Sequence, residues 1–247
     1  MTPDPDHYRG VVRDPRRTRL ARCGYLDRFD PVRLNASPRV RALYDGLFRL
    51  ISDGGAPPRL LDIGAGTGVY LDTLARHAGS VAAVDASADM IRVARDYCAG
   101  RGLAGIACAV ADAAALPFPD GAFDAVVALD VLHHVDRPAA VLAEAHRVLR
   151  PGGRLLVFEP NVLNPAMLLV HALPREERRA LGLCRPRRLR TLAEARFDTR
   201  HWSGVCQLVT DASGLRRRLL DAYLRAFGLL APEWLHPRQV WVGVKKG

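Results

Sequence analysis

Two histidines and a glutamate in the middle of the chain have side chains that can move a proton. His133 and His134 lie in "DVLHHV", after an apolar run that ends at Leu129, and Glu159 lies in "FEP", at the end of the next apolar run. A neutral imidazole with a pKa of about 6.5 can take a proton from a hydroxyl, and a carboxylate can orient that imidazole or the acceptor. We interpret these three residues as candidate catalytic groups. The alternative is a structural role, in which one histidine packs in the core or bonds to the backbone.

A glycine-rich segment upstream can bind a ligand through its backbone. In "LLDIGAGTGVY", residues 60–70, an apolar run is followed by Gly64, Gly66 and Gly68 and then by residues with helical spacing. Glycines permit a tight turn with left-handed backbone angles, and the start of a helix offers unpaired N–H groups to a ligand. Dinucleotides and S-adenosylmethionine both bind at such a joint, so other residues must discriminate between them.

The acidic residues near this segment favour S-adenosylmethionine over NAD. The dinucleotide pattern G-x-G-x-x-G would need a third glycine where this chain has Val69. Asp62 precedes the glycines, where its charge would repel a pyrophosphate and attract the ammonium group of S-adenosylmethionine. Asp85 follows 23 residues after Asp62 and suits the ribose hydroxyls of either ligand.

These residues must be positioned by alternating strands and helices. Apolar runs predict strands at residues 60–63, 81–84, 106–110, 123–129, 154–158 and in "RQVWVGVKK", and amphipathic spacing predicts helices at residues 40–51, 69–78, 88–101 and 138–149. "RPGG", residues 150–153, is expected to end the last of these helices and to turn the chain into the next strand. Such alternation forms a parallel sheet covered on both faces, with ligand sites at the carboxyl ends of the strands.

Four motifs in order carry a resemblance to a known family. "LLDIGAGTG", "VDAS" with Met90, "VADAAALPFPDGAFDAVVALDVLHHV" and "RVLRPGGRLLVFEP" resemble the class I S-adenosylmethionine-dependent methyltransferases, in the small-molecule group that includes quinone-biosynthesis and natural-product enzymes. The resemblance covers roughly residues 59–160. It implies an α/β fold with a Rossmann-like, doubly wound, seven-stranded sheet, whose last strand, "RQVWVGVKK", is antiparallel, and with helices on both faces.

The resemblance also implies the residues that bind S-adenosylmethionine. Those around its methionine part are Asp62, Gly64, Ala65, Gly66 and Gly68, with the Leu129 carbonyl accepting from the ammonium group; Asp85 and its neighbour Ala86 would lie at the ribose, and Met90, Asp112 and Ala113 at the adenine. No metal is implied. Taken singly, Met90 also reads as core packing and Asp112 as a loop residue.

The segments outside this core are expected to recognise the acceptor. We expect residues 1–37 to form an N-terminal arm or flap and residues 38–247 to form the methyltransferase domain, with 160–236 as a variable substrate-recognition region before the last strand. Tyr8, Tyr25, His201 and Trp202 are candidate pocket residues from these segments, and each has an equal claim to a structural role.

Composition restricts the class of protein. The chain of 247 residues is 49% hydrophobic and 25% charged, as in ordinary globular proteins. No apolar run approaches the roughly 18 residues of a membrane span, and "MTPDPDHYRG" lacks the pattern of a secretory leader, so we expect a cytoplasmic protein without a membrane span. The five cysteines show no C-x-x-C pair, which argues against a zinc site or a disulfide framework.

The net charge of +10 does not by itself indicate a nucleic-acid partner. Nearly all of the positive charge is arginine, since only Lys245 and Lys246 are lysines, and the chain is rich in alanine; both features fit a GC-rich genome. Amino-methylating enzymes that act on nucleic-acid bases carry an Asn/Asp-Pro-Pro-aromatic turn where this chain has "DVLH". The arginines of "PREERRALGLCRPRRLR" also lack interleaved aromatic residues for base stacking, so we read them as a solvated face.

The sequence therefore predicts a methyltransferase for a small-molecule acceptor. We expect methylation of a hydroxyl in secondary metabolism, with S-adenosylmethionine as cofactor. N- or C-methylation and a protein of this fold that transfers no methyl group remain alternatives. The acceptor and the oligomeric state stay open, and an oligomer is possible.

Overall fold

The computed structural model describes residues 30–246 except 53–54, 173–177, 179 and 208–213. Its centre is a seven-stranded sheet in the order β3-β2-β1-β4-β5-β7-β6. The strands are β1 (Arg59–Ile63), β2 (Ser80–Asp85), β3 (Ile106–Val110), β4 (Phe123–Leu129), β5 (Leu149–Pro160), β6 (Phe197–Val205) and β7 (Arg238–Lys245). Strands β1 to β5 pair in parallel, whereas β7 is antiparallel to both β5 and β6. The predicted fold class and the antiparallel last strand are confirmed.

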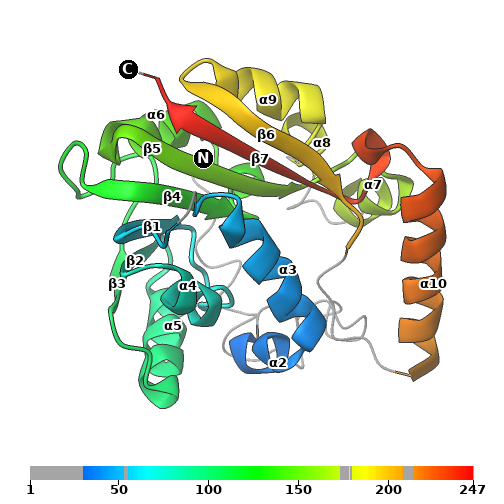
Figure 1. Cartoon of the computed structure of the whole chain (residues 1–247), viewed down its shortest axis with the longest axis horizontal. Helices are drawn as coiled ribbons and strands as arrows, with labels where there is room; N and C mark the ends of the chain where they lie inside the picture. The colour runs from blue at the N-terminus through cyan, green and yellow to red at the C-terminus, as the bar shows by residue number, and fades with distance from the viewer. Residues whose placement is uncertain (1–29, 53–54, 173–177, 179, 208–213, 247) are drawn as a thin grey trace.

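Helices cover both faces of this sheet (Figure 1). One apolar cluster joins the sheet to α3 (Pro38–Arg49), α4 (Leu71–His77) and α5 (Ala88–Arg101), and a second joins its other face to α6 (Pro138–Val148) and α9 (Pro186–Glu194). The shorter elements around the site are η4 (Leu132–His134), α7 (Pro165–Ala172), α8 (Ala180–Leu183) and η5 (Glu233–Leu235). Strand β4 is buried along nearly its whole length because both of its faces are covered.

Two local features differ from the sequence expectation. "RPGG" does not form a turn ahead of the strand, because β5 already begins at Leu149 and residues 150–153 bulge out between Leu149 and Arg154, which pair with Phe123 and Ala125. Gly152 has a φ of 71°, a conformation that glycine adopts without strain and that permits this bulge. Strand β6, inside the region expected to be variable, completes the sheet although no apolar run predicts it.

The described end of the N-terminal segment packs on the fold. Residues 31–36 form helix α2 (Pro31–Ala36), in which Leu34 and Asn35 are buried. The Asn35 side-chain amide donates to the Val69 carbonyl and to the Tyr97 hydroxyl, at 3.0 and 3.2 Å, which ties this helix to the glycine-rich segment and to α5. Tyr8, Tyr25 and the rest of the expected arm lie outside the described residues, so the arm stays a prediction.

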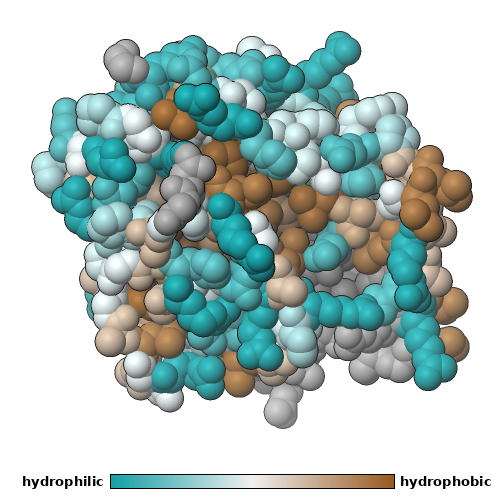
Figure 2. Space-filling view, viewed as in Figure 1, coloured by the Kyte–Doolittle hydropathy of each residue, from teal (hydrophilic) through white to brown (hydrophobic). Residues whose placement is uncertain are grey.

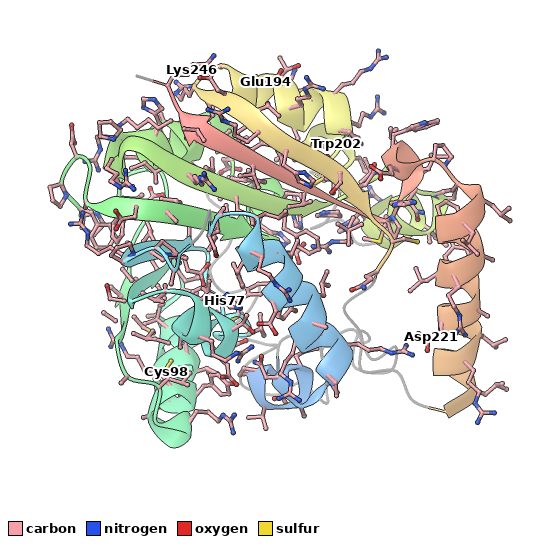
Figure 3. All side chains as sticks on the ribbon, viewed as in Figure 1. His77, Cys98, Glu194, Trp202, Asp221 and Lys246 are labelled. Atoms are coloured by element: carbon pink, nitrogen blue, oxygen red, sulfur yellow. The ribbon has the colours of Figure 1, made fainter. Side chains whose placement is uncertain are left out.

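Helix α10 (Gly214–Leu230) stands apart from the sheet, at the right of Figure 1. Its Asp221, labelled in Figure 3, points toward α3 and accepts from Arg39 at 2.5 Å. Leu229 and Leu230 at its end are 86% and 85% exposed, where Figure 2 shows a hydrophobic patch at the rim. None of the helices in the described part of the chain combines the length and the apolar character that crossing a bilayer requires.

Candidate functional site

The glycine-rich segment is a loop pressed against the end of β4. Gly64, Gly66 and Gly68 have φ angles of 75°, 54° and 87°, in the left-handed region. The N–H groups of residues 64 and 65 donate to the Val84 carbonyl on β2 at 2.8 and 2.9 Å, which fixes the loop. A Cβ on Gly64 would overlap the Val131 side chain, whereas a Cβ on Gly66 would meet no atom within 4 Å. The loop is therefore packed at Gly64 and open at Gly66, where a ligand could approach the backbone.

Asp62, at the end of β1, is a buried carboxylate without a partner. Its residue is 1% exposed, and neither side-chain oxygen accepts a hydrogen bond from any described residue. Burial, helped by the nearby charge of Asp85, raises the pKa of Asp62 to about 8. Burying such a group costs free energy unless a donor satisfies it. An ammonium group fits this need, because it brings both donors and the opposite charge.

Asp85, at the end of β2, fastens the open part of the loop. One of its carboxylate oxygens accepts from the Gly66 N–H at 2.9 Å, and the other accepts from the Ser87 N–H at 2.8 Å. Burial raises the pKa of Asp85, and these two hydrogen bonds oppose the rise. A carboxylate offers about four lone-pair sites, so Asp85 keeps capacity to accept from two hydroxyls. The adjacent Ala86 is exposed.

The remaining predicted cofactor residues lie around this point. The Ala111 N–H donates to the Asp85 carbonyl at 3.0 Å, which brings the segment after β3 beside Asp85. There Asp112 is exposed and accepts from the Ala114 N–H at 2.8 Å, and Ala113 is half-buried. Met90 is buried in the first turn of α5, and Leu129 is buried at the end of β4. The structure thus gathers the predicted set at neighbouring strand ends.

Glu159, the second buried carboxylate of the site, is saturated by its own chain. One oxygen accepts from the N–H groups of Val131 and Leu132 at 3.0 and 2.7 Å, and the other lies 2.5 Å from His133 Nδ1 and 3.7 Å from the Cys184 thiol. The Glu159 side chain is fully buried, so it can act on a bound substrate only through His133. It fixes both the orientation of the imidazole and the path of the chain after β4.

Three of these side chains also lie close enough to suggest a metal site. The nearest ligand atoms of His133, Glu159 and Cys184 are all within 4.8 Å of one another. However, two ligands of one zinc ion, each about 2 Å from it in tetrahedral geometry, are separated by more than the 2.5 Å between His133 Nδ1 and Glu159. This arrangement is a hydrogen-bonded cluster, and it would have to open before it could hold an ion.

The two histidines differ in their surroundings. His133 is 3% exposed, and its ring lies 3.9 Å from the ring of His134, centre to centre, and 5.6 Å from that of the buried His171. His134 is half-buried. His133 forms part of the wall of a groove of about 1420 Å³ that runs between η4, the start of α6, α8 and α9. Sequence reasoning missed His171 and Cys184, because neither residue belongs to a motif with a recognisable spacing.

A polar cluster next to the loop joins Asp130, which follows the fourth predicted strand, to Tyr70 and Arg238, which sequence reasoning did not single out. Asp130, directly after β4, has a φ of 57° and pairs with the buried Arg238 at the start of β7. Its other oxygen accepts from the Tyr70 hydroxyl at 3.2 Å, and the Arg238 guanidinium lies over the Phe158 ring at 4.4 Å. Burial and the charge of Asp130 raise the pKa of Tyr70 well above its usual value. An arginine at the head of an otherwise apolar final strand was the available signal.

His201 and Trp202, the other candidate pocket residues, lie on β6, where Figure 3 labels Trp202. Trp202 packs against the cluster between the sheet and α6, and His201 Nε2 lies 2.9 Å from the Ser203 hydroxyl. Both therefore have structural surroundings.

Comparison with known proteins identifies the central region. Residues 61–157 match the family model described as a methyltransferase domain. This region, less than half of the chain, is similar to methyltransferase domains. It contains Asp62, the glycine loop, Asp85 and both candidate histidines, and it ends two residues before Glu159.

Curated relatives match over a similar length of the chain. The demethylmenaquinone methyltransferase of Tropheryma whipplei (strain Twist) is 39% identical over 104 residues, which are 42% of this chain and 42% of that protein. The ubiquinone/menaquinone biosynthesis C-methyltransferase UbiE of Azotobacter vinelandii is 40% identical over 114 residues, which are 44% of this chain and 45% of that protein. The chain thus spans less than half of the length of these relatives.

Solved structures share the fold over more of the chain. The [4+2]-cyclase SpnF superposes with a TM-score of 0.61 and 24% identity over 83% of this chain and 81% of that one. Phosphoethanolamine N-methyltransferase 2 of Haemonchus contortus, solved in complex with S-adenosyl-L-methionine, gives a TM-score of 0.59 with 18% identity over 83% of this chain and 53% of that one. These similarities show the fold, and the names show that it serves more than one reaction.

Proposed function

We propose that this chain transfers a methyl group from S-adenosylmethionine to a small-molecule acceptor. The observation that carries the proposal is Asp62, a buried carboxylate that accepts from no described residue and lies beside an open glycine loop. The methyltransferase domain and the methyltransferase names of its curated relatives support the same activity. A pyrophosphate would place its negative charge next to Asp62, which disfavours NAD.

The residues at the strand ends fit this cofactor. Asp62 and the Leu129 carbonyl would accept from the ammonium group, Asp85 from the ribose hydroxyls and Asp112 from the adenine amino group, with Ala113 and the buried Met90 beside the ring. When bound, S-adenosylmethionine would supply an electrophilic methyl group on its sulfonium; the bond from the acceptor atom to this carbon forms as the C–S bond breaks, and S-adenosylhomocysteine is the leaving group. The chain holds the two reactants in line and excludes water from the buried strand ends.

We further propose that the acceptor atom is a hydroxyl oxygen and that His133 or His134 removes its proton. His133 is favoured because it lines the groove and because Glu159 lies against Nδ1 and so orients the imidazole ring. Glu159 is then a positioning residue that holds the ring and stabilises it when protonated. The relatives named C-methyltransferases favour carbon as the second candidate acceptor atom.

Calorimetry tests the cofactor. We expect S-adenosylhomocysteine to bind and NADH not to bind. Binding of NADH without any response to S-adenosylhomocysteine would contradict the proposal.

Isotope labelling tests the transfer. Incubation with cofactor carrying a ¹³C-methyl group and a panel of hydroxylated acceptors, a hydroquinone included, should release S-adenosylhomocysteine and place the label on the product. The ¹³C chemical shift then distinguishes oxygen, nitrogen and carbon as the methylated atom. A protein that binds the cofactor and forms no product with any acceptor would support the alternative without transfer.

Histidine variants test the base. We expect the variant of the catalytic histidine, His133→Ala or His134→Ala, to lose about 10²- to 10⁴-fold in rate with unchanged affinity for S-adenosylhomocysteine. The wild-type rate should rise with pH as the imidazole loses its proton. Near-wild-type turnover in both single variants and in the double variant would show that these histidines are structural.

A further inference from the structure

The groove beside His133 has a basic end that the proposed function does not explain. It runs between η4 with the start of α6 on one side and α8 with α9 on the other, and its volume is about 1420 Å³. Arg185, Arg187 and Arg188 line it, at the junction between α8 and α9. The three arginines are exposed, in agreement with the solvated face that the sequence suggested, and they also lie along a hollow.

Within the described part of the chain, no ion pair neutralises the charge of these three arginines. Asp136 is the one acidic residue among those that line the groove, so positive charge exceeds negative. The first turn of α9 holds no acidic residue either, and its backbone N–H groups add to the positive potential. Three arginines in these surroundings can bind an anionic group of a ligand.

Other parts of the groove lining are apolar. Leu163, Leu181 and Trp234 line it, from the segment after β5, from α8 and from η5. Leu163 is 40% exposed and Trp234 is 52% exposed, so both present apolar surface to a ligand. The groove therefore combines an apolar wall with an uncompensated basic end, which is the pattern that binds an amphiphile with a negatively charged group.

The groove also reaches the candidate chemistry. Leu132 and His133 line it, and Val131, two residues before His133, packs against Gly64 of the cofactor loop. A single short segment, residues 131–133, thus separates the loop from the groove. Glu159 fixes this segment through the N–H groups of residues 131 and 132 and through His133 itself. A molecule in the groove would lie against the histidine proposed as base.

We propose that this groove is the acceptor site and that the acceptor is an amphiphile with an apolar body and an anionic group such as a phosphate or carboxylate. Arg185, Arg187 and Arg188 bind the anionic group, and Leu163, Leu181 and Trp234 contact the apolar body. This inference rests on the proposed methyltransferase function and adds the chemical class of its substrate.

Binding of simple amphiphiles to the full chain tests the inference. Decyl phosphate, decanol and decyltrimethylammonium are titrated below their micellar concentrations and followed by calorimetry. We expect decyl phosphate to bind more tightly than either of the others. The double variant Arg187→Gln/Arg188→Gln should weaken decyl phosphate binding by about tenfold or more, since each arginine contributes a charge-assisted hydrogen bond. The control Arg41→Gln/Arg225→Gln removes the same charge from exposed positions on α3 and α10 and should have little effect.

The affinity for S-adenosylhomocysteine, measured in the same variants, separates this inference from the proposed function. Unchanged cofactor affinity with lost decyl phosphate binding supports the assignment of the groove. Equal weakening in the control variant, equal binding of the cation or the alcohol, or no binding of decyl phosphate to the wild type would overturn it. Binding to vesicles of phosphatidylglycerol and phosphatidylcholine without binding of monomeric decyl phosphate would also overturn it, because the basic end would then contact a membrane surface. If the wild type does not bind S-adenosylhomocysteine, the result would instead contradict the proposed function.

Discussion

Two strands of the same sheet, β1 and β5, each carry a carboxylate at their carboxyl end, and these two acids have opposite surroundings. Glu159 is fully buried and has donors from two backbone N–H groups, an imidazole and a thiol. Asp62 is 1% exposed and has no donor from any described residue. Since an unpaired buried carboxylate costs free energy, Asp62 destabilises the ligand-free fold. A bound ligand that donates to Asp62 would compensate for this cost. Glu159 therefore stabilises the fold of its own chain, whereas Asp62 is available to bind a ligand.

Replacing Glu159 should have the largest effect on stability. Glu159→Ala leaves two buried N–H groups and His133 without their acceptor, and we expect a loss of about 3–5 kcal/mol in the free energy of unfolding. Glu159→Gln keeps an acceptor oxygen for the backbone and should lose less. Urea denaturation measures both. An alanine variant as stable as the wild type would mean that Glu159 does not organise the segment after β4.

Replacing Asp62 should weaken ligand binding without a loss of stability. Asp62→Asn removes the charge that would pair with the ammonium group, and we expect the affinity for S-adenosylhomocysteine to fall by about 1.5–3 kcal/mol, roughly 10- to 100-fold. Above about pH 8, where Asp62 carries a buried unpaired charge, the ligand-free variant should be at least as stable as the wild type. Calorimetry and thermal unfolding measure the two effects. Asp96→Asn, at an exposed position on α5, is the matched control. A destabilised variant with normal affinity would make Asp62 a structural residue like Glu159.

The pH dependence of stability sharpens the same contrast. The pKa of Asp62 is about 8 in the folded protein and close to 4 in an unfolded chain, so the folded state binds the proton more tightly. Its contribution to stability is therefore fully present below about pH 4 and is lost as the pH rises through about 8. Urea denaturation of the ligand-free protein at pH 5 and pH 8 should show this decline, and Asp62→Asn should reduce it. Equal declines in both proteins would assign the effect to other groups.

The smallest expected signal is a proton released on binding. At pH 7 Asp62 is mostly protonated in the ligand-free protein, and an ammonium group beside it favours the ionised form. Binding of S-adenosylhomocysteine should then release a fraction of a proton, up to about one. Calorimetry in two buffers of different ionisation enthalpy measures it. The release should disappear in Asp62→Asn, and its persistence there would point to another titrating group.

The half of the sheet that holds Asp62 was predictable because its signals are local. The predicted strand at 106–110 and the predicted helix at 88–101 match the structure residue for residue, since β3 is a continuous apolar run and α5 lies between the capping Ser87 and the left-handed Gly102. The spacing of Asp62, the glycines and Asp85 likewise follows directly from strand–loop–helix order. Which of these acids lacks a partner depends on three-dimensional packing, and no spacing rule indicates it.

The half that holds Glu159 was less predictable because its contacts are remote. Cys184 follows Glu159 by 25 residues in the chain and has no motif, yet its thiol lies against the carboxylate. Strand β6 carries polar residues at many positions because it is an edge strand, paired on one side by β7, so its pattern lacks an apolar run. The groove arginines were visible as a charge run, but only the packing of α8 and α9 beside η4 places them together.

The order β5-β7-β6 also constrains how the chain assembles during synthesis. Strand β6 pairs with β7 and not with β5, although β5 and β6 are both made before β7. The sheet therefore stays open at β5, with β6 unpaired, until residues 238–245 have left the ribosome and can insert between them. Pairings of this long sequence separation form slowly, and an exposed strand edge invites aggregation in the interval. A nascent chain stalled before β7 would lack two strands of the sheet rather than one.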